Sequence, residues 1–396
     1  MFKLRDYQLS KGNEGLGILK DYKVLILSME VRTGKSHTAL YIANNYKNVL
    51  FVTKKKAIGS IQSDYDTAKY SFNITIINYE SLHKVTGKFD LVVADESHVI
   101  SAYPKPSIRT KALKKLVTND LIIMTGTLIP ESNSQIYHQL WISPHSPFRW
   151  FKNFYAWFRE YGTPEVVYTS YGPSKSYKVS NWDEIYKKIK HLMITYTQKE
   201  SGFKSSVNET IIHVDTTTGS IIRRLKRDRV VEGKNEVILA DTAVKLMQKV
   251  HQLSSGTIKF ESGNKQVLDY SKVNYIRDNF KGKKLAIFYK FTAEFEAIKS
   301  VLDVTQSVEE FNESDKHIAL QIISGREGIN LSKADCLIMY NIDFSAVSYW
   351  QARDRMTTKD REVNNIYWLF SKGGIEDNIY KAVSAKKDFT LKLFNK

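Results

Sequence analysis

The chain has 396 residues, which is too long for one ordinary core and fits two or three domains. Hydrophobic residues make up 42% of the sequence and aromatic residues 12%, which argues against global disorder. The formal net charge is +17, and an excess of that size favours a polyanionic partner, although a generally basic soluble protein would also have it.

The single cysteine, Cys336, excludes a disulfide framework and a cysteine-based zinc site, and it suits a reducing cytoplasm. Its place in the apolar run CLIMYN predicts a buried strand residue. The first residues, MFKLRDYQLSKG, contain no apolar segment typical of a signal peptide. No stretch approaches the roughly 20 apolar residues that a membrane span needs. We therefore expect a cytoplasmic protein without a membrane partner.

Short apolar runs in the first third of the chain predict strands that are buried on both faces. These runs are 23–27, 49–53, 74–79, 91–95 and 121–126. Helix-compatible segments lie between some of them, at 35–46 and 107–116. Strand and helix in alternation predict a parallel sheet with helices on both faces.

A second set of such runs lies in the C-terminal half, at 210–215, 284–289, 318–324, 336–341 and 366–370. The residues between the two sets are aromatic, basic and mostly helical in pattern. The predicted fold class is therefore α/β, with two tandem parallel-sheet domains and a helical insertion. The expected boundaries are 1–140 for the first domain, 141–208 for the insertion and 209–396 for the second domain.

The stretch SMEVRTGKSHTAL, residues 28–40, ends like a phosphate-binding loop. Gly34, Lys35 and Ser36 follow a predicted strand and open a helix-compatible stretch, which is the setting that such a loop requires. Backbone N–H groups would hold the phosphates, Lys35 would neutralise them, and the Ser36 hydroxyl would ligate Mg2+. Met29 stands where a first glycine is expected, and Gly-Lys-Ser is common by chance, so the loop alone leaves the assignment open.

Two acids in the run LVVADESH, residues 91–98, support the assignment of the phosphate loop. Asp95 and Glu96 end a predicted buried strand, in the right order after the loop. In a phosphate-loop ATPase a carboxylate there holds magnesium, and a neighbouring glutamate can orient or deprotonate the attacking water. An exposed turn without a catalytic role is the alternative, and the combination with the loop argues against it. Thr125-Gly126-Thr127, after the next strand, would by itself be only a turn.

The order of these motifs resembles the motor of superfamily 2 helicases and translocases, in the compact phage or bacterial form of the Swi/Snf-type branch. The resemblance covers nearly the whole chain, and many such members lack the first loop glycine. The segments that carry it are LRDYQ (4–8), EVRTGKS (30–36), FVTKKKAIGSIQSDY (51–65), DESH (95–98), SGREGINLSKADCLIMYN (324–341) and YWQARDRMTTKDR (349–361).

The resemblance implies two RecA-like domains that hydrolyse ATP with Mg2+ in the cleft between them, as a monomeric motor that moves along nucleic acid, most readily DNA. It also implies roles for single residues. The expected catalytic residues are Lys35, Asp95, Glu96 and Arg355, and the expected metal ligands are Ser36 and Asp95. The expected nucleotide contacts are Gln8, which would face adenine, Arg32, Thr33, Gly34, Lys35, Ser36, Gly328, Gln351 and Arg355. The expected nucleic-acid contacts are Thr53, Lys54, Lys55, Ser324 and Arg326.

The last motif departs from the family at one position, because Thr358 stands where the family has a second arginine. That arginine is the usual finger on the γ-phosphate. Arg355 is the first candidate to replace it and Arg361 the second, with Lys359 less suitable because lysine cannot make a bidentate phosphate contact. Weak hydrolysis is the remaining alternative.

Two further segments have a core or solvent interpretation beside a functional one. FRWFKNFYAWFREYG (148–162) could stack bases, yet its aromatic residues recur at helical spacing, which favours core packing. RRLKRDR (223–229) is typical of a solvated helix face, with nucleic-acid contact as the minority option.

Two rival functions stay open at the sequence level. A kinase or transport ATPase would not explain the second sheet and the segment around Gln351. A hydrolysis-deficient nucleic-acid-binding protein that keeps the helicase fold is favoured by Thr358.

Overall fold

The computed structural model describes residues 3–169, 172–202, 206–233, 235–325, 329, 331–357 and 361–385. It divides into two compact units, Met1–Phe203 (unit 1) and Lys204–Lys396 (unit 2), which are described separately. None of the helices in the described ranges is long and apolar enough to cross a membrane.

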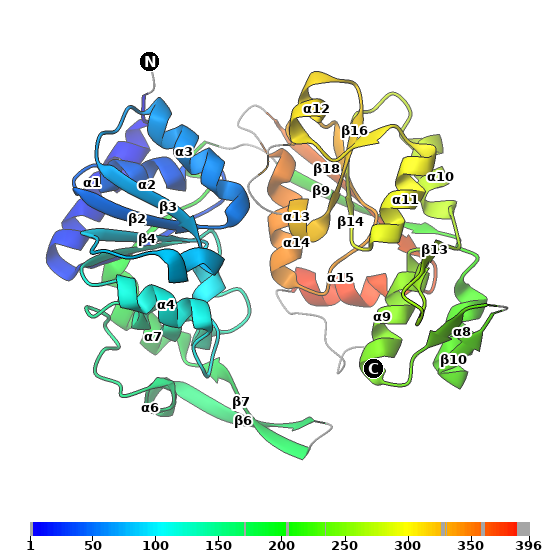
Figure 1. The fold of residues 1–396 in the computed structure, drawn as a ribbon, viewed down its shortest axis with the longest axis horizontal. Helices are drawn as coiled ribbons and strands as arrows, with labels where there is room; N and C mark the ends of the chain where they lie inside the picture. Colours follow the sequence, from blue (N-terminus) through cyan, green and yellow to red (C-terminus); the bar gives the residue numbers. More distant parts are fainter. Residues whose placement is uncertain are drawn as a thin grey trace. The chain divides into compact units, whose positions relative to one another are not determined.

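Among the described residues, unit 1 contains a sheet of six parallel strands in the order β3-β2-β4-β5-β1-β8 (Figure 1). The strands are β1 (Val24–Met29), β2 (Asn48–Thr53), β3 (Asn73–Asn78), β4 (Leu91–Asp95), β5 (Asp120–Met124) and β8 (Met193–Tyr196). Because all of them run in one direction, the loops that follow them leave the sheet at a single edge.

The helices of unit 1 are α1 (Asp6–Tyr22), α2 (Lys35–Ala43), α3 (Ile58–Thr67), α4 (Ile108–Leu116), α5 (Ile136–Trp141), α6 (Phe154–Tyr161) and α7 (Trp182–Ile189). Alternate residues of β1 pack into the hydrophobic cores on opposite faces of the sheet. Leu25 and Leu27 pack with Leu40 of α2, whereas Val24 and Ile26 pack on the other face. The prediction of strands buried on both faces is therefore confirmed for β1, β2, β4 and β5, whereas β3 is only partly buried.

The segment between the two predicted domains is not mostly helical. It contains an antiparallel hairpin of β6 (Gly162–Thr169) and β7 (Gly172–Ser180), which projects from the body of unit 1 in Figure 1. It also supplies β8, which pairs with β1 and completes the first sheet. The sequence pattern missed both, because β6 and β7 are largely exposed and polar and β8 has only four residues.

Unit 2 contains, within its described part, a second sheet of six parallel strands in the order β15-β16-β14-β17-β18-β9. The strands are β9 (Ser206–Val214), β14 (Leu285–Tyr289), β15 (Val304–Thr305), β16 (His317–Gln321), β17 (Cys336–Met339) and β18 (Val363–Ser371). The predicted fold class of two parallel-sheet domains is confirmed. Cys336 is buried in β17, as predicted, and burial raises the pKa of its thiol to about 11.

The helices of unit 2 are α8 (Gly219–Asp228), α9 (Ala243–Ser254), α10 (Ser271–Asn279), α11 (Thr292–Val301), α12 (Val308–Glu313), α13 (Ile322–Gly325), α14 (Ala346–Arg353) and α15 (Glu376–Ser384). Two small hairpins, β10 (Val230–Glu232) with β11 (Val237–Leu239) and β12 (Thr257–Lys259) with β13 (Lys265–Val267), lie beside them. The basic residues at 223–229 are exposed on α8 and after it, as expected of a solvated face.

Close contact between α1 and the sheet depends on a glycine. A Cβ atom on Gly15 would lie 2.8 Å from the Cδ1 atom of Ile42 and 3.0 Å from the Cδ2 atom of Leu25, both of which are buried. Gly17, two residues farther along α1 and exposed, has no atom within 4 Å of its would-be Cβ. The missing side chain at Gly15 therefore lets α1 lie directly on the strand that precedes the phosphate loop.

We expect Gly15→Ala and Gly17→Ala to change the free energy of unfolding in opposite directions. The methyl group at Gly15 overpacks the core, which costs about 1–3 kcal/mol before any gain in helix propensity. At the exposed Gly17 only that gain remains, about 1 kcal/mol. Urea denaturation of the two variants and the parent measures both changes. Equal stabilisation by the two substitutions would show that α1 does not pack closely on the sheet.

Candidate active site

The residues after β1 form a tight loop whose shape depends on Gly34. Its φ angle is 79°, in the left-handed region that glycine adopts most easily. Its carbonyl accepts hydrogen bonds from the Gln8 Nε2 atom at 3.4 Å and the Thr38 hydroxyl at 3.2 Å. A Cβ on Gly34 would lie 2.0 Å from the Gln8 amide nitrogen, so no larger residue fits there without displacing Gln8. Thr33 closes the loop by donating from its hydroxyl to the Glu30 carbonyl at 2.7 Å.

The start of α1 holds the loop from one side. Gln8 is buried, and its Oε1 atom accepts from the Arg5 backbone N–H at 2.8 Å. The Tyr7 hydroxyl donates to the Thr33 carbonyl at 3.0 Å. Residues 4–8 and the loop thus lie together in the structure. Both ends of the Gln8 amide are engaged by backbone here, and its contact with adenine stays a prediction.

Residues at the end of unit 1 also hold this loop, a role that no pattern in the sequence assigned to them. The Tyr196 carbonyl accepts from the Glu30 N–H at 2.9 Å, and the Tyr196 ring stacks on Tyr7 with ring centroids 4.6 Å apart. The Gln198 backbone N–H donates to the Glu30 carboxylate at 2.6 Å, and its side chain donates to the Val31 carbonyl at 3.0 Å. We call Tyr196 and Gln198 the loop clasp.

Lys35 begins α2 and its ammonium group turns back over the loop. The Nζ atom lies 3.4 Å from the Glu30 carbonyl oxygen. A Cβ on Gly126 would lie 3.5 Å from the same Nζ atom, so the Thr-Gly-Thr turn after β5 approaches the lysine. The Thr125 hydroxyl also accepts from the Thr127 N–H at 3.0 Å, which shapes that turn. The turn is therefore part of the site's surroundings.

Asp95 and Glu96 end β4 at the same edge of the sheet as the loop. The Asp95 carboxylate accepts from the Thr53 hydroxyl at 2.6 Å and from the Glu96 N–H at 2.9 Å. The buried Tyr79 hydroxyl donates to the Asp95 carbonyl at 2.5 Å. Glu96 has a φ angle of 50°, unusual outside glycine, and its carboxylate lies 3.2 Å from the Nδ1 atom of His98. These contacts fix the two carboxylates in different directions.

The two neighbouring carboxylates have opposite pKa shifts. Burial raises the pKa of Asp95 to about 6, and the charge of Glu96 acts in the same direction, against the Thr53 hydrogen bond and the charge of Lys35. Burial alone would also raise the pKa of Glu96, but the hydrogen bond and charge of His98, with the charge of Lys35, hold it well below its usual value. Glu96 is therefore ionised at neutral pH.

The residues at this edge fit a nucleoside triphosphate with Mg2+. In the described ranges no three side chains that bind metals gather into one group, so a metal cage made of protein alone is not found there. Mg2+ instead takes one or two carboxylate or hydroxyl ligands together with phosphate oxygens. Asp95 and Ser36 would be those ligands, and the Lys35 ammonium, held over the loop, would neutralise phosphate charge.

The structure corrects one predicted nucleic-acid contact and keeps two in place. Thr53 is fully buried and its hydroxyl is bonded to Asp95, so it supports the carboxylate and does not face a partner. Lys54, which follows Thr53, is half-buried, and Lys55 is exposed. Their assignment as nucleic-acid contacts stays a prediction. Among the C-terminal residues, the Ser324 side chain, Arg326, Gly328, Thr358 and Lys359 lie outside the described residues.

Gln351 and Arg355 lie together within unit 2. Gln351 is buried near the end of α14, and its carbonyl accepts from the Arg355 Nε atom at 2.8 Å. Arg355 is 8% exposed in this structure. Arg361, the second candidate for the finger, donates to the carbonyls of Ser332, Ala334 and Asp335 at 2.7–3.2 Å. Its guanidinium thus clamps the turn before β17, which argues against a role on phosphate.

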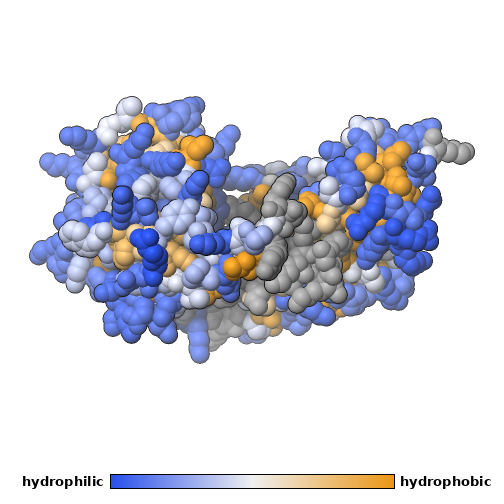
Figure 2. Space-filling model, turned by 90° about the horizontal axis from the view of Figure 1, so that it is seen from below, coloured by the Kyte–Doolittle hydropathy of each residue, from blue (hydrophilic) through white to orange (hydrophobic). Residues whose placement is uncertain are grey.

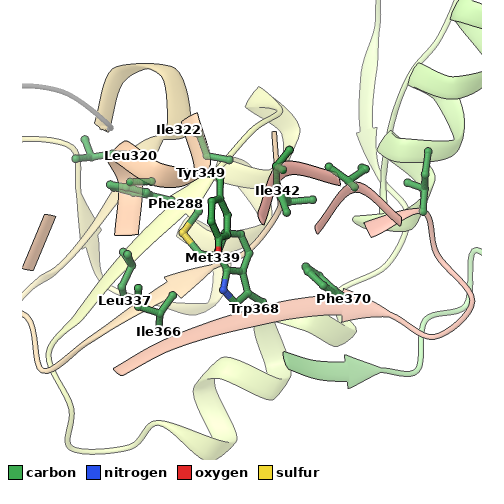
Figure 3. Close-up of a cluster of buried hydrophobic side chains, with 14 of the residues drawn as sticks. Phe288, Leu320, Ile322, Leu337, Met339, Ile342, Tyr349, Ile366, Trp368 and Phe370 are labelled. Carbon is green, nitrogen blue, oxygen red and sulfur yellow. The ribbon is translucent and has the colours of Figure 1, made fainter. Parts of the chain in front are cut away.

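A carboxylate on β9, which no pattern in the sequence indicates, anchors α14. Glu209 lies 2.9 Å from the Arg353 guanidinium and accepts from the hydroxyls of Tyr349 at 3.0 Å and Tyr380 at 3.2 Å, and from the Trp368 indole at 2.9 Å. Tyr349 stacks on Trp368 (Figure 3), and their ring centroids are 5.4 Å apart. Since α14 carries Gln351 and leads into Arg355, Glu209 positions both residues.

Comparison with known proteins bears on unit 2 first. Residues 299–357 match the family model "Helicase conserved C-terminal domain". Over these residues the chain is similar to helicase C-terminal domains. The matched region overlaps both segments on which the resemblance rested in the second half, and it supports the predicted resemblance to helicases there.

Two solved structures are similar to the whole chain: the Sulfolobus solfataricus SWI2/SNF2 ATPase core in complex with dsDNA and the same core domain alone. Each is 15% identical in sequence with a TM-score of 0.44. The match to the DNA complex covers 97% of this chain and 91% of the other, and the match to the core domain alone covers 98% and 89%. No curated protein matches the sequence.

We expect Glu209→Ala to destabilise unit 2 far more than Tyr380→Phe. The first change leaves the mostly buried Arg353 without its carboxylate, which costs about 3–5 kcal/mol. The second removes one hydrogen bond to the same carboxylate from α15, worth about 0.5–1.5 kcal/mol. Chemical denaturation followed by circular dichroism gives both values. Similar losses in the two variants would mean that the Arg353 contact contributes little.

Proposed function

We propose that this protein is a nucleic-acid-dependent ATPase of the Swi/Snf type, a motor that hydrolyses ATP and translocates along DNA. One observation carries the proposal: a phosphate-type loop, Lys35 and the Asp95–Glu96 pair meet at one edge of a parallel sheet in a chain that is also similar, in part, to a helicase C-terminal domain. A kinase or a transport ATPase would account for the loop but not for that domain.

Each residue has a role that its surroundings support. Lys35 would hold the β/γ-phosphates, while Ser36 and Asp95 would ligate Mg2+, which lowers the barrier by neutralising charge that develops on the phosphate oxygens. Glu96, ionised and held by His98, would orient the attacking water. Arg355 would supply the positive charge of the transition state from unit 2, for which its side chain has to leave its present, buried position.

DNA is proposed as the track because of the +17 charge and the similarity to helicase domains. Cycles of ATP binding and hydrolysis would change the conformation of the motor and advance it along the backbone, with strand separation or branch remodelling as the result. A second candidate is a hydrolysis-deficient nucleic-acid binder. Thr358, where the family has an arginine, and the burial of Arg355 favour it.

The first experiment is steady-state ATP hydrolysis with and without DNA. We expect DNA to stimulate turnover of the parent. Lys35→Ala should abolish turnover, because the variant loses the positive charge that would neutralise the phosphates but loses no core volume. Lys20→Ala, an exposed lysine on α1, is the matched control and should hydrolyse ATP at the parent rate. A parent that binds DNA but hydrolyses no ATP would favour the non-enzymatic candidate.

The identity of the arginine finger is tested by Arg355→Ala beside Arg361→Ala. An arginine finger contributes on the order of a thousandfold to the rate, so Arg355→Ala should lower DNA-stimulated kcat by about that factor while KM for ATP changes little. Arg361→Ala should lower the melting temperature, since three carbonyls lose their donor, but leave kcat of the folded protein nearly intact. The reverse pattern would move the finger to Arg361.

A further inference from the structure

A hollow of about 440 Å3 lies at the edge of unit 1 that is opposite the phosphate loop. Lys23 of its lining directly precedes β1, and His191 and Leu192 directly precede β8, so the hollow adjoins the starts of these two paired strands. The phosphate loop follows the end of β1, six residues farther on, which is roughly 20 Å away along a strand. The hollow is therefore separate from the candidate nucleotide site.

The lining of the hollow is rich in donors suited to anions. Lys23 and Arg149 contribute cationic groups, and His145 and His191 contribute imidazole rings. Asp21 is an acid in the same lining, and Lys23 also lies 3.8 Å from Asp120 outside it. The Tyr22 ring meets the His191 ring edge-on, with centroids 4.6 Å apart, and is 45% exposed. Phosphate groups suit this combination of cations and N–H donors.

Trp150, next to the hollow, is an exposed aromatic platform. Its side chain is 81% exposed, whereas Phe154 and Phe158 of the same aromatic segment are buried in the core as predicted, and Phe151 and Tyr161 are partly buried. The Arg149 guanidinium carbon lies 4.6 Å from the centroid of the Trp150 rings, and Arg149 also donates to the Ser146 carbonyl at 3.3 Å. Arg149, which lines the hollow, therefore also contacts the indole of Trp150.

The visible surface in Figure 2 is mainly hydrophilic, with apolar residues in small separate patches. An indole that is 81% exposed costs solvation free energy, and its contact with Arg149 covers little of it. Base–aromatic stacking beside a basic groove is how proteins bind unpaired nucleotides without sequence preference. A duplex would keep its bases stacked on each other and could not use the indole.

We propose that the hollow and Trp150 form a contact for single-stranded nucleic acid, with one unpaired base stacked on the indole and neighbouring phosphates on Arg149, Lys23 and the two imidazoles. This goes beyond the proposed function, because the contact needs neither ATP nor the residues around the phosphate loop. It would hold an unpaired strand on unit 1 while the motor works elsewhere.

The test is equilibrium binding of a labelled oligothymidylate, without nucleotide, measured by fluorescence anisotropy over a range of salt concentrations. Trp150→Ala should weaken binding at least about fivefold, the lower end of the loss for one base stack, with an unchanged salt slope. Arg149→Ala should weaken binding and reduce the slope by about 0.7, the value for one phosphate contact on a single strand. Tyr155→Ala and Arg159→Ala, exposed residues of α6, are matched controls that should bind like the parent.

Two competitors complete the experiment. Binding of a duplex should be insensitive to Trp150→Ala, and polyglutamate, an anion without bases, should compete poorly for the parent. The proposal is overturned if Trp150→Ala and Tyr155→Ala bind the single strand equally well, if Trp150→Ala weakens duplex binding as much, or if polyglutamate competes as well as unlabelled oligothymidylate. Because no ATP is present, the outcome is independent of whether the protein hydrolyses it.

Discussion

The common direction of the strands in each sheet is the constraint on which the candidate site depends. In unit 1 the loop after β1, the acids after β4 and the turn after β5 belong to distant parts of the sequence. They meet because the carboxyl ends of parallel strands lie at one edge. Burial of the apolar faces of the strands stabilises this arrangement, because helices cover both faces and leave the edge with the loops accessible to a ligand.

Within that edge, hydrogen bonds to backbone groups determine the shape of the site. Gly34 takes a left-handed conformation that places its carbonyl against Gln8 and Thr38. Asp95 and Glu96 follow each other in the chain but differ in environment, because Thr53 supports the first and His98 the second. Two carboxylates with pKa values shifted in opposite directions can take different roles, one as a metal ligand and one beside water.

The sequence predicted those parts of the structure that have a strong local pattern. The run LVVAD corresponds residue for residue to β4, and the helix expected at 107–116 is α4, one residue shorter. The hairpin and β8 were missed because exposed strands lack alternation and four residues are too few to show it. The Glu209 cluster and the loop clasp depend on contacts between distant residues, so local patterns carry no trace of them.

The burial of Thr53 shows why a residue that was predicted from a motif can be assigned the wrong role. Its position in a motif suggested a surface contact, but a threonine at the end of a strand that neighbours β4 is directed inward, toward Asp95. The aromatic segment shows the opposite case. Its helical spacing correctly predicted the buried face of α6, while Trp150, which lies before the helix, escaped that periodicity and stayed on the surface.

The loop clasp has a consequence for the order in which the protein matures during synthesis. The phosphate loop leaves the ribosome early, but Tyr196 and Gln198, which brace Glu30 and Val31, follow about 165 residues later, as the 167-residue separation of Gln198 and Val31 shows. Until that segment emerges, β1 lacks one of its two neighbouring strands. A nascent chain cut at the apparent domain end, residue 140, would therefore hold the loop's residues without its final shape.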